Sequence, residues 1–143
     1  DEETVRKAIW AVAPALADHG TWDMVAAAMT GTGPTPGFTS APRRARLFDP
    51  ISWRRTAFAQ TEDALILRTG QLVRSAVIVP HGRVQAIEVT AGPWESARRL
   101  GSVQFYSTSG PVTARIGHLD LDQAVALAAD QATRLSVAMA AAR

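Results

Sequence analysis

Apolar and polar residues alternate through the middle of the chain, and this period of two is typical of antiparallel strands with one buried face. Val103 and Phe105, for example, alternate with Gln104 and Tyr106. Turn residues such as Gly70 divide the pattern into short runs. The expected strands are residues 44–48, 54–60, 63–69, 71–79, 83–91, 102–108 and 111–117.

Helical spacing replaces this alternation at both ends of the chain. Apolar residues recur every three or four positions over residues 2–18, and a second short helix is expected at residues 22–29. After the last strand, a broad apolar stripe predicts a helix from about Leu121 onward, with Asp120 opening a capping box. A helical turn or wide loop is expected at residues 93–101.

The segment between the second helix and the strands, residues 30–42, is rich in Pro, Gly, Ser and Thr and is predicted to be a linker. We therefore expect an N-terminal helical extension with its linker, residues 1–42, and a β-rich domain, residues 43–143. About seven short strands followed by one amphipathic helix favour a small barrel or sandwich that the helix covers.

Composition changes this picture little. Hydrophobic residues make up 47% of the 143 residues, which excludes general disorder. The net charge of +2 does not require a nucleic-acid partner and is compatible with an anionic membrane surface. The absence of cysteine excludes disulfides and thiolate chemistry. No apolar run approaches the roughly 20 residues that span a bilayer. Because the chain begins with Asp1 rather than Met, we expect it to be a segment of a longer protein.

Residue types that carry chemistry form no recognisable pattern. The histidines (His19, His81 and His118) lie near predicted element ends without spaced partners, so we interpret them as turn or surface residues. The glycine-rich residues 31–37 follow a predicted helix and lack a P-loop lysine. Four Trp with one Tyr do not make a stacking platform for nucleic acid. The sequence therefore predicts no catalytic, metal-binding or cofactor-binding residue, no cofactor, and no enzyme.

Four segments resemble, in the same order, those of the bacterial membrane-flanked pleckstrin-homology-like domains, and the similarity covers roughly residues 44–138. Trp94 departs from the family pattern, which often has Gln or Leu there, so any contact made by that loop could differ here. The segments are residues 67–74 (LRTGQLVR), 79–89 (VPHGRVQAIEV), 92–101 (GPWESARRLG) and 103–112 (VQFYSTSGPV).

The resemblance implies a pleckstrin-homology-like antiparallel β-barrel or sandwich of about seven strands, capped by the C-terminal helix and preceded by the N-terminal extension. Members are usually tethered by transmembrane helices, often in tandem, and face the cytoplasm. The implied function is a non-catalytic binding or scaffold domain at the cytoplasmic face of a bacterial cell membrane, with sibling domains or other proteins as partners. The alternative is a module that binds anionic lipid headgroups.

Several residues are candidates for these contacts. Arginine suits phosphate because its guanidinium donates two parallel hydrogen bonds, but adjacent arginines in a strand should point to opposite faces, which argues against a single site. The candidate arginines for one end of the barrel are Arg54, Arg55, Arg68 and Arg74.

Other candidates have a structural and a functional interpretation. Arg83 and Gln85 match the family pattern, and they either support the fold or contact a partner. Trp94, like Trp53, either packs within the domain or lies at a membrane interface. The basic run at residues 43–46 is either a solvated loop or strand edge, or a contact with lipid headgroups or a partner.

Overall fold

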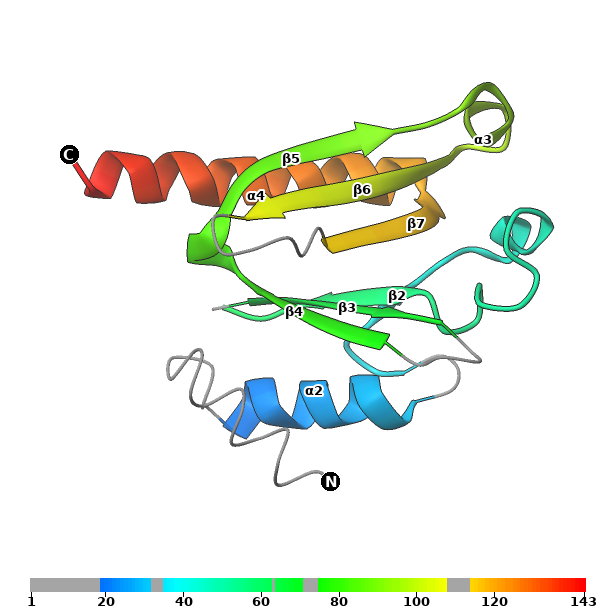
Figure 1. The fold of residues 1–143 in the computed structure, drawn as a ribbon, viewed down its shortest axis with the longest axis horizontal. Helices are drawn as coiled ribbons and strands as arrows, with labels where there is room; N and C mark the ends of the chain where they lie inside the picture. The colour runs from blue at the N-terminus through cyan, green and yellow to red at the C-terminus, as the bar shows by residue number, and fades with distance from the viewer. Residues whose placement is uncertain (1–18, 32–34, 63, 71–74, 108–113) are drawn as a thin grey trace.

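The computed structural model describes residues 19–31, 35–62, 64–70, 75–107 and 114–143. Two antiparallel sheets face each other between two helices (Figure 1). The first sheet has the order β1-β2-β3-β4 and the second has the order β5-β6-β7. The strands are β1 (Thr39–Ser40), β2 (Ala57–Gln60), β3 (Ala64–Thr69), β4 (Ser75–Pro80), β5 (Val84–Thr90), β6 (Leu100–Ser107) and β7 (Ala114–Asp120).

The helices cover the sheets and their connections. The helix α2 (His19–Thr30) lies against the outer face of the first sheet, and α4 (Leu121–Ala141) runs along the second (Figure 1). The short helix α3 (Pro93–Ala97) joins β5 to β6. Two 3₁₀ helices complete the described part of the chain, η2 (Arg43–Leu47) after β1 and η3 (His81–Arg83) after β4.

The core lies between the two sheets, and alternation along β3 explains how it forms. Leu65 and Leu67 point inward and pack with residues of β6 and β7 such as Phe105 and Ile116. Between them, Ile66 points outward and is buried against Val25 of α2. Each such side chain contributes about 1.5–3 kcal/mol when it is fully buried. Because both faces of β3 are covered, α2 is part of the packing that stabilises the first sheet.

The helix α4 closes the sandwich beside the second sheet. Its N-cap is Asp120, whose carboxylate accepts the backbone N–H of Gln123 at 3.3 Å. Ala124 and Leu127 on one face join the core, while residues 136–143 are exposed. None of the described helices has the length and hydropathy that a membrane-spanning helix needs.

These features confirm the predicted fold class, two antiparallel sheets capped by a C-terminal helix, in its sandwich form. The predicted alternative of a closed barrel is wrong, because the strands form two separate sheets. The chain leaves the first sheet at Pro80, which lacks an N–H, and η3 then directs it into the second sheet. β4 and β5 therefore belong to different sheets.

Three local predictions need correction or comment. The expected strand at 44–48 is wrong: η2 forms there, because Ala45 is buried against Ala41 and Leu100 in a tight turn. The strand expected from residue 54 begins at Ala57, after a turn. The expected linker contains β1, which pairs with β2.

The helix expected at 22–29 is confirmed as α2, and the one expected at 2–18 lies outside the described residues. Both α2 and β1 precede residue 43 and pack with the first sheet. The division of the chain at residue 42 stays a prediction.

Candidate interaction surface at the α3 end

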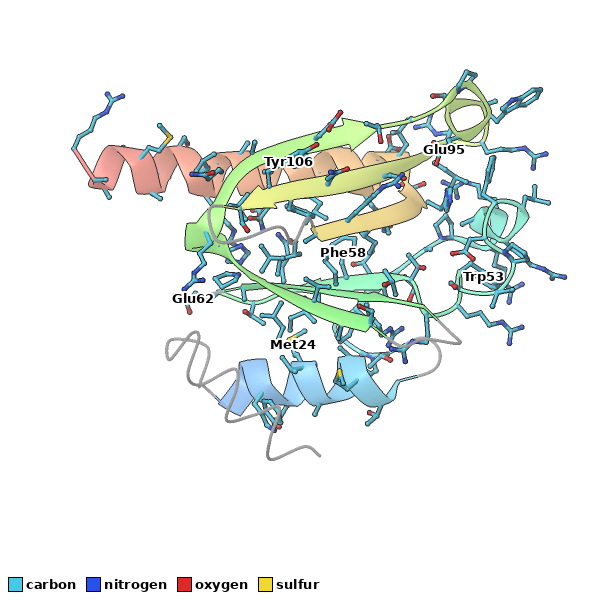
Figure 2. All side chains as sticks on the ribbon, viewed as in Figure 1. Met24, Trp53, Phe58, Glu62, Glu95 and Tyr106 are labelled. Carbon is cyan, nitrogen blue, oxygen red and sulfur yellow. The ribbon has the colours of Figure 1, made fainter. Side chains whose placement is uncertain are left out.

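One end of the sandwich presents apolar and basic side chains to solvent. It is formed by residues 43–54 and 92–99, and we call it the α3 end. Figure 2 shows Trp53 and Glu95 at this end and Glu62 at the opposite one. Because α3 and η2 come from distant parts of the sequence, the contacts that join them determine the shape of this surface.

The start of α3 points Trp94 outward. Gly92 is the N-cap and Pro93 occupies the first helical position, where its missing N–H costs no hydrogen bond. Glu95 turns back, and its Oε2 accepts the N–H of Gly92 at 2.9 Å. Successive helical residues are rotated by about 100°. Trp94 therefore faces solvent, with 80% of its surface exposed.

Arg44 joins η2 to the loop after α3. Its Nε donates to the carbonyl oxygen of Arg98 at 2.7 Å, and one terminal nitrogen donates to that of Arg99 at 3.0 Å. The same nitrogen pairs with the carboxylate of Asp120, the N-cap of α4. Burial acts to raise the pKa of Asp120, but the hydrogen bonds from Arg44 and the Gln123 N–H outweigh it, so the pKa lies below its ordinary value.

A second connection runs through His118 of β7. Its ring stacks on Phe48, just after η2, with centroids 5.5 Å apart. Its Nδ1 lies 2.9 Å from Oε1 of Glu95, an ion-pair distance when the imidazole is protonated, although the atoms are not aligned for a hydrogen bond. The φ of 55° at His118 is rare for a residue with a side chain, and the contacts of its ring with Phe48 and Glu95 help to hold it there.

The outward groups of the α3 end are apolar tips among arginines. Leu47 and Ile51 are 66% and 55% exposed, and Trp94 is more exposed than either. At the α3 end, the exposed arginines that have no carboxylate partner among the described residues are Arg43, Arg46, Arg54 and Arg98. The guanidinium of Arg54 lies over the ring of Trp53, 5.6 Å from its centroid.

The carboxylates of this end are engaged within the domain. Asp49 accepts the backbone N–H of Ser52 at 2.9 Å, and Glu95 accepts that of Gly92. Asp120 pairs with Arg44, and Asp122 pairs with Arg99 at 2.8 Å. Each of these carboxylates therefore has a partner within the domain, although the Asp122–Arg99 pair is itself exposed.

Two of the predicted contact arginines are buried together between the C-terminal end of α2 and the first sheet. Arg68 is 0% exposed, and its Nε donates to the carbonyl oxygen of Arg55 at 2.8 Å. Arg55, 1% exposed, donates to the carbonyl oxygens of Ala28 and Gly31 at the C-terminus of α2, where the helix dipole favours a cation. Burial and then the nearby Arg55 lower the pKa of Arg68.

The structure does not bring the predicted residues together. Arg54 and Trp94 lie at the exposed α3 end, whereas Arg55 and Arg68 are covered. Arg74 lies outside the described residues. The last two candidates, Arg83 of η3 and Gln85 of β5, are exposed and follow the turn at the opposite end of the sandwich.

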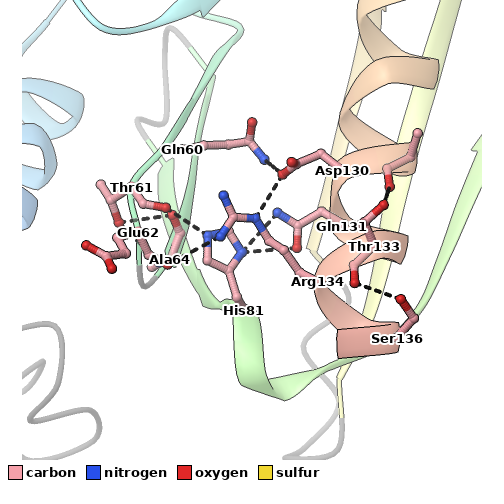
Figure 3. Close-up of polar contacts among 11 residues, drawn as sticks. Gln60, Thr61, Glu62, Ala64, His81, Asp130, Gln131, Thr133, Arg134 and Ser136 are labelled. Carbon is pink, nitrogen blue, oxygen red and sulfur yellow. Dashed lines mark hydrogen bonds and ion pairs between the residues drawn. The ribbon is translucent and has the colours of Figure 1, made fainter. Parts of the chain in front are cut away.

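A polar network closes that opposite end (Figure 3). The two ring nitrogens of His81 lie 2.9 Å from the carbonyl oxygen of Thr61 and 2.9 Å from Nε2 of Gln131, a buried residue of α4. Asp130 accepts hydrogen bonds from Arg134 and Gln60, each at 2.9 Å. The Arg134 bond is the main cause of the lowered pKa of Asp130. These groups join α4 to the turn between β2 and β3 and to η3.

The sequence did not single out Leu47 or Ile51 as surface contacts, and Arg98 was included only as part of the loop 92–101. The basic run at residues 43–46 was the available signal for this end, since it contains Arg43 and Arg46 and directly precedes Leu47. Nothing near Arg98 in the sequence indicates that η2 lies beside it, because the contact through Arg44 joins residues 54 positions apart.

Two facing antiparallel sheets with a capping C-terminal helix define a pleckstrin-homology-like fold, a class whose members are in general non-catalytic binding modules. A family model described as the bacterial PH domain matches residues 8–134, and the chain belongs to that family, as the resemblance predicted. No curated protein and no solved structure gave a significant match.

Proposed function

We propose that this chain is a non-catalytic binding module that acts at the cytoplasmic face of a bacterial membrane, and that the α3 end is the surface with which it binds. The observation that carries this proposal is that Trp94, Leu47 and Ile51 are exposed at the same end of the sandwich as four exposed arginines. These arginines lack carboxylate partners among the described residues. Apolar side chains gathered in this way on a soluble domain usually mark an interaction site.

The chemistry of this surface suits binding. A guanidinium stays protonated at any physiological pH, so arginine donates hydrogen bonds and charge rather than taking part in proton transfer. Indole and aliphatic side chains gain free energy when they leave water. A partner that complements the α3 end therefore carries negative charge around an apolar contact.

Cell fractionation tests the proposal. The chain, fused to a fluorescent protein and produced in a bacterial host, is expected to sediment with the membrane fraction. A variant with Leu47→Glu, Ile51→Glu and Trp94→Glu should move to the soluble fraction, because it places carboxylates where an apolar contact is needed.

The matched control changes three similarly exposed apolar residues of α4, Val125→Glu, Val137→Glu and Met139→Glu, which are 52%, 64% and 57% exposed. This control has the same net charge and should stay with the membrane fraction. A parent chain that remains soluble, or a control that is displaced as strongly as the α3-end variant, would contradict the proposal.

A further inference from the structure

We infer that the partner of the α3 end is the anionic lipid surface itself, with Trp94, Leu47 and Ile51 entering the boundary between headgroups and acyl chains while the surrounding arginines bind lipid phosphates. The inference rests on the proposed function and specifies its partner. It concerns docking of a whole surface on a bilayer rather than recognition of one headgroup in a pocket.

The three apolar side chains protrude from the domain. Trp94 lies on α3, Leu47 ends η2, and Ile51 lies in the turn that follows, and each exposes more than half of its surface. Separate protruding tips suit a soft surface that they can enter, whereas a folded protein partner would need a matching hollow for each. Tryptophan also favours the membrane–water interface, because its ring is apolar and its N–H is polar.

The charges lie on the same segments as these tips. Arg43 and Arg46 precede Leu47 on η2, Arg54 follows Ile51, and Arg98 follows α3. Guanidinium groups bind phosphate oxygens through paired hydrogen bonds, and their long stems can lie along acyl chains while the charge stays at the headgroups. The carboxylates of this end each have a partner within the domain, so little unpaired negative charge opposes an anionic surface.

The surface is built before it binds. Arg44 joins η2 to the loop after α3, and His118 contacts both Phe48 and Glu95. Ordering these segments therefore costs little at the moment of docking. Docking in this way turns the C-terminal end of α4, which lies at the opposite end of the molecule, away from the bilayer (Figure 1).

Sedimentation with protein-free vesicles tests the inference. The 143-residue chain is mixed with vesicles of equal parts phosphatidylglycerol and phosphatidylethanolamine, or of phosphatidylcholine alone. We expect the partition coefficient to be at least about tenfold higher on the anionic vesicles and to fall as salt rises above about 0.1 M. Equal partition on both vesicle types, or no binding to either, overturns the inference.

Two pairs of variants locate the contact. Arg46→Ala with Arg98→Ala should weaken binding to the anionic vesicles roughly tenfold, because each arginine at the surface adds electrostatic attraction. The matched control, Arg115→Ala with Arg143→Ala, removes the same charge from exposed arginines elsewhere and should change binding much less. The apolar variants Leu47→Ser, Ile51→Ser and Trp94→Ser should also lose binding, unlike Val125→Ser, Val137→Ser and Met139→Ser. Equal losses within either pair contradict the inference.

The vesicle and cell experiments separate the two proposals. Membrane association in cells that depends on the α3 end, without binding to pure lipid, would mean that the partner is a membrane protein. That result overturns the lipid inference and leaves the proposed function standing. Circular dichroism checks that each variant is folded. The dependence of binding on salt and on lipid composition is measured with the unchanged chain, so this part of the test does not depend on any variant folding.

Discussion

Arg54 and Arg55 are neighbours in the sequence, and the structure places them in opposite surroundings. Arg54 lies at the exposed α3 end over the ring of Trp53. Arg55 is buried with Arg68 between α2 and the first sheet, where both donate to backbone carbonyl oxygens. The buried arginines donate to backbone carbonyl oxygens within the domain, while Arg43, Arg46, Arg54 and Arg98 of the α3 end have no carboxylate partner among the described residues.

This contrast teaches that one residue type performs two tasks in the same small domain. Buried arginines fasten α2 and the 35–38 segment to the first sheet, and removing them should affect stability. Exposed arginines contribute little to stability, and removing them should affect binding. Variants that separate stability from binding therefore test the comparison directly.

The largest expected effect is on the buried site. Arg68→Ala removes the donor to the Arg55 carbonyl oxygen and the contact with the Phe38 ring, and it leaves a cavity. The free energy of unfolding should fall by about 3 kcal/mol, measured by urea denaturation. Arg54→Ala is the matched control and should change it by less than about 0.5 kcal/mol. Similar losses in both variants would remove the distinction between the two sites.

The His81 network should give the next largest effect. His81→Ala leaves the buried Gln131 side chain and the Thr61 carbonyl oxygen without this partner. Unfolding should become easier by about 2 kcal/mol, while vesicle binding stays unchanged. Gly82→Ala is the neighbouring control, because an added methyl group meets nothing within 4 Å. It should be neutral or slightly stabilising. Reduced vesicle binding in a folded His81→Ala protein would contradict this assignment.

Acid should weaken the contacts of Asp120 and Asp130. The pKa of each lies below its ordinary value, so the ionised form stabilises the folded state. Their contribution is complete above the ordinary carboxyl pKa of about 4 and is lost as the pH falls through the lower folded-state values. Arg44→Ala should cost about 1 kcal/mol at neutral pH, because the pair is partly exposed, and less in acid. A cost that grows on acidification would contradict the pairing.

The smallest expected effect on stability is at the most exposed residue. Trp94→Ala should change the free energy of unfolding by less than about 0.5 kcal/mol, because the side chain contacts little of its own domain. The same change should weaken binding to anionic vesicles measurably. Thermal unfolding and sedimentation on one protein sample check both. A strongly destabilised Trp94→Ala protein would mean that this residue belongs to the structure rather than to the binding surface.

Local signals in the sequence predicted much of the fold. Alternation placed β3 within one residue, and the Asp120 cap placed the start of α4 at Leu121. Contacts between distant residues were not predictable in this way. The segment 43–47 is η2 because Ala45 packs on Leu100, and Arg68 is buried because α2 covers the outer face of the first sheet.

The candidate surface was only partly predictable for the same reason. The sequence indicated that Arg54 and Arg55 would point in opposite directions, yet it did not say which would be exposed. It singled out Trp94 and the basic run at 43–46, but a tertiary contact through Arg44 brings them to one end. Exposure of Leu47 and Ile51 depends on how η2 packs, which no local pattern encodes.

The most direct test of membrane docking through the α3 end is the depth of a spin label in the bilayer. The chain has no cysteine, so Ser96→Cys on α3 and Ala126→Cys on α4, both exposed positions, can each carry a single nitroxide. Accessibility to oxygen and to a water-soluble nickel complex is measured on anionic vesicles. The account predicts that the label at residue 96 enters the interfacial region while that at residue 126 stays in water. Equal accessibility at both positions in the bound protein would contradict it.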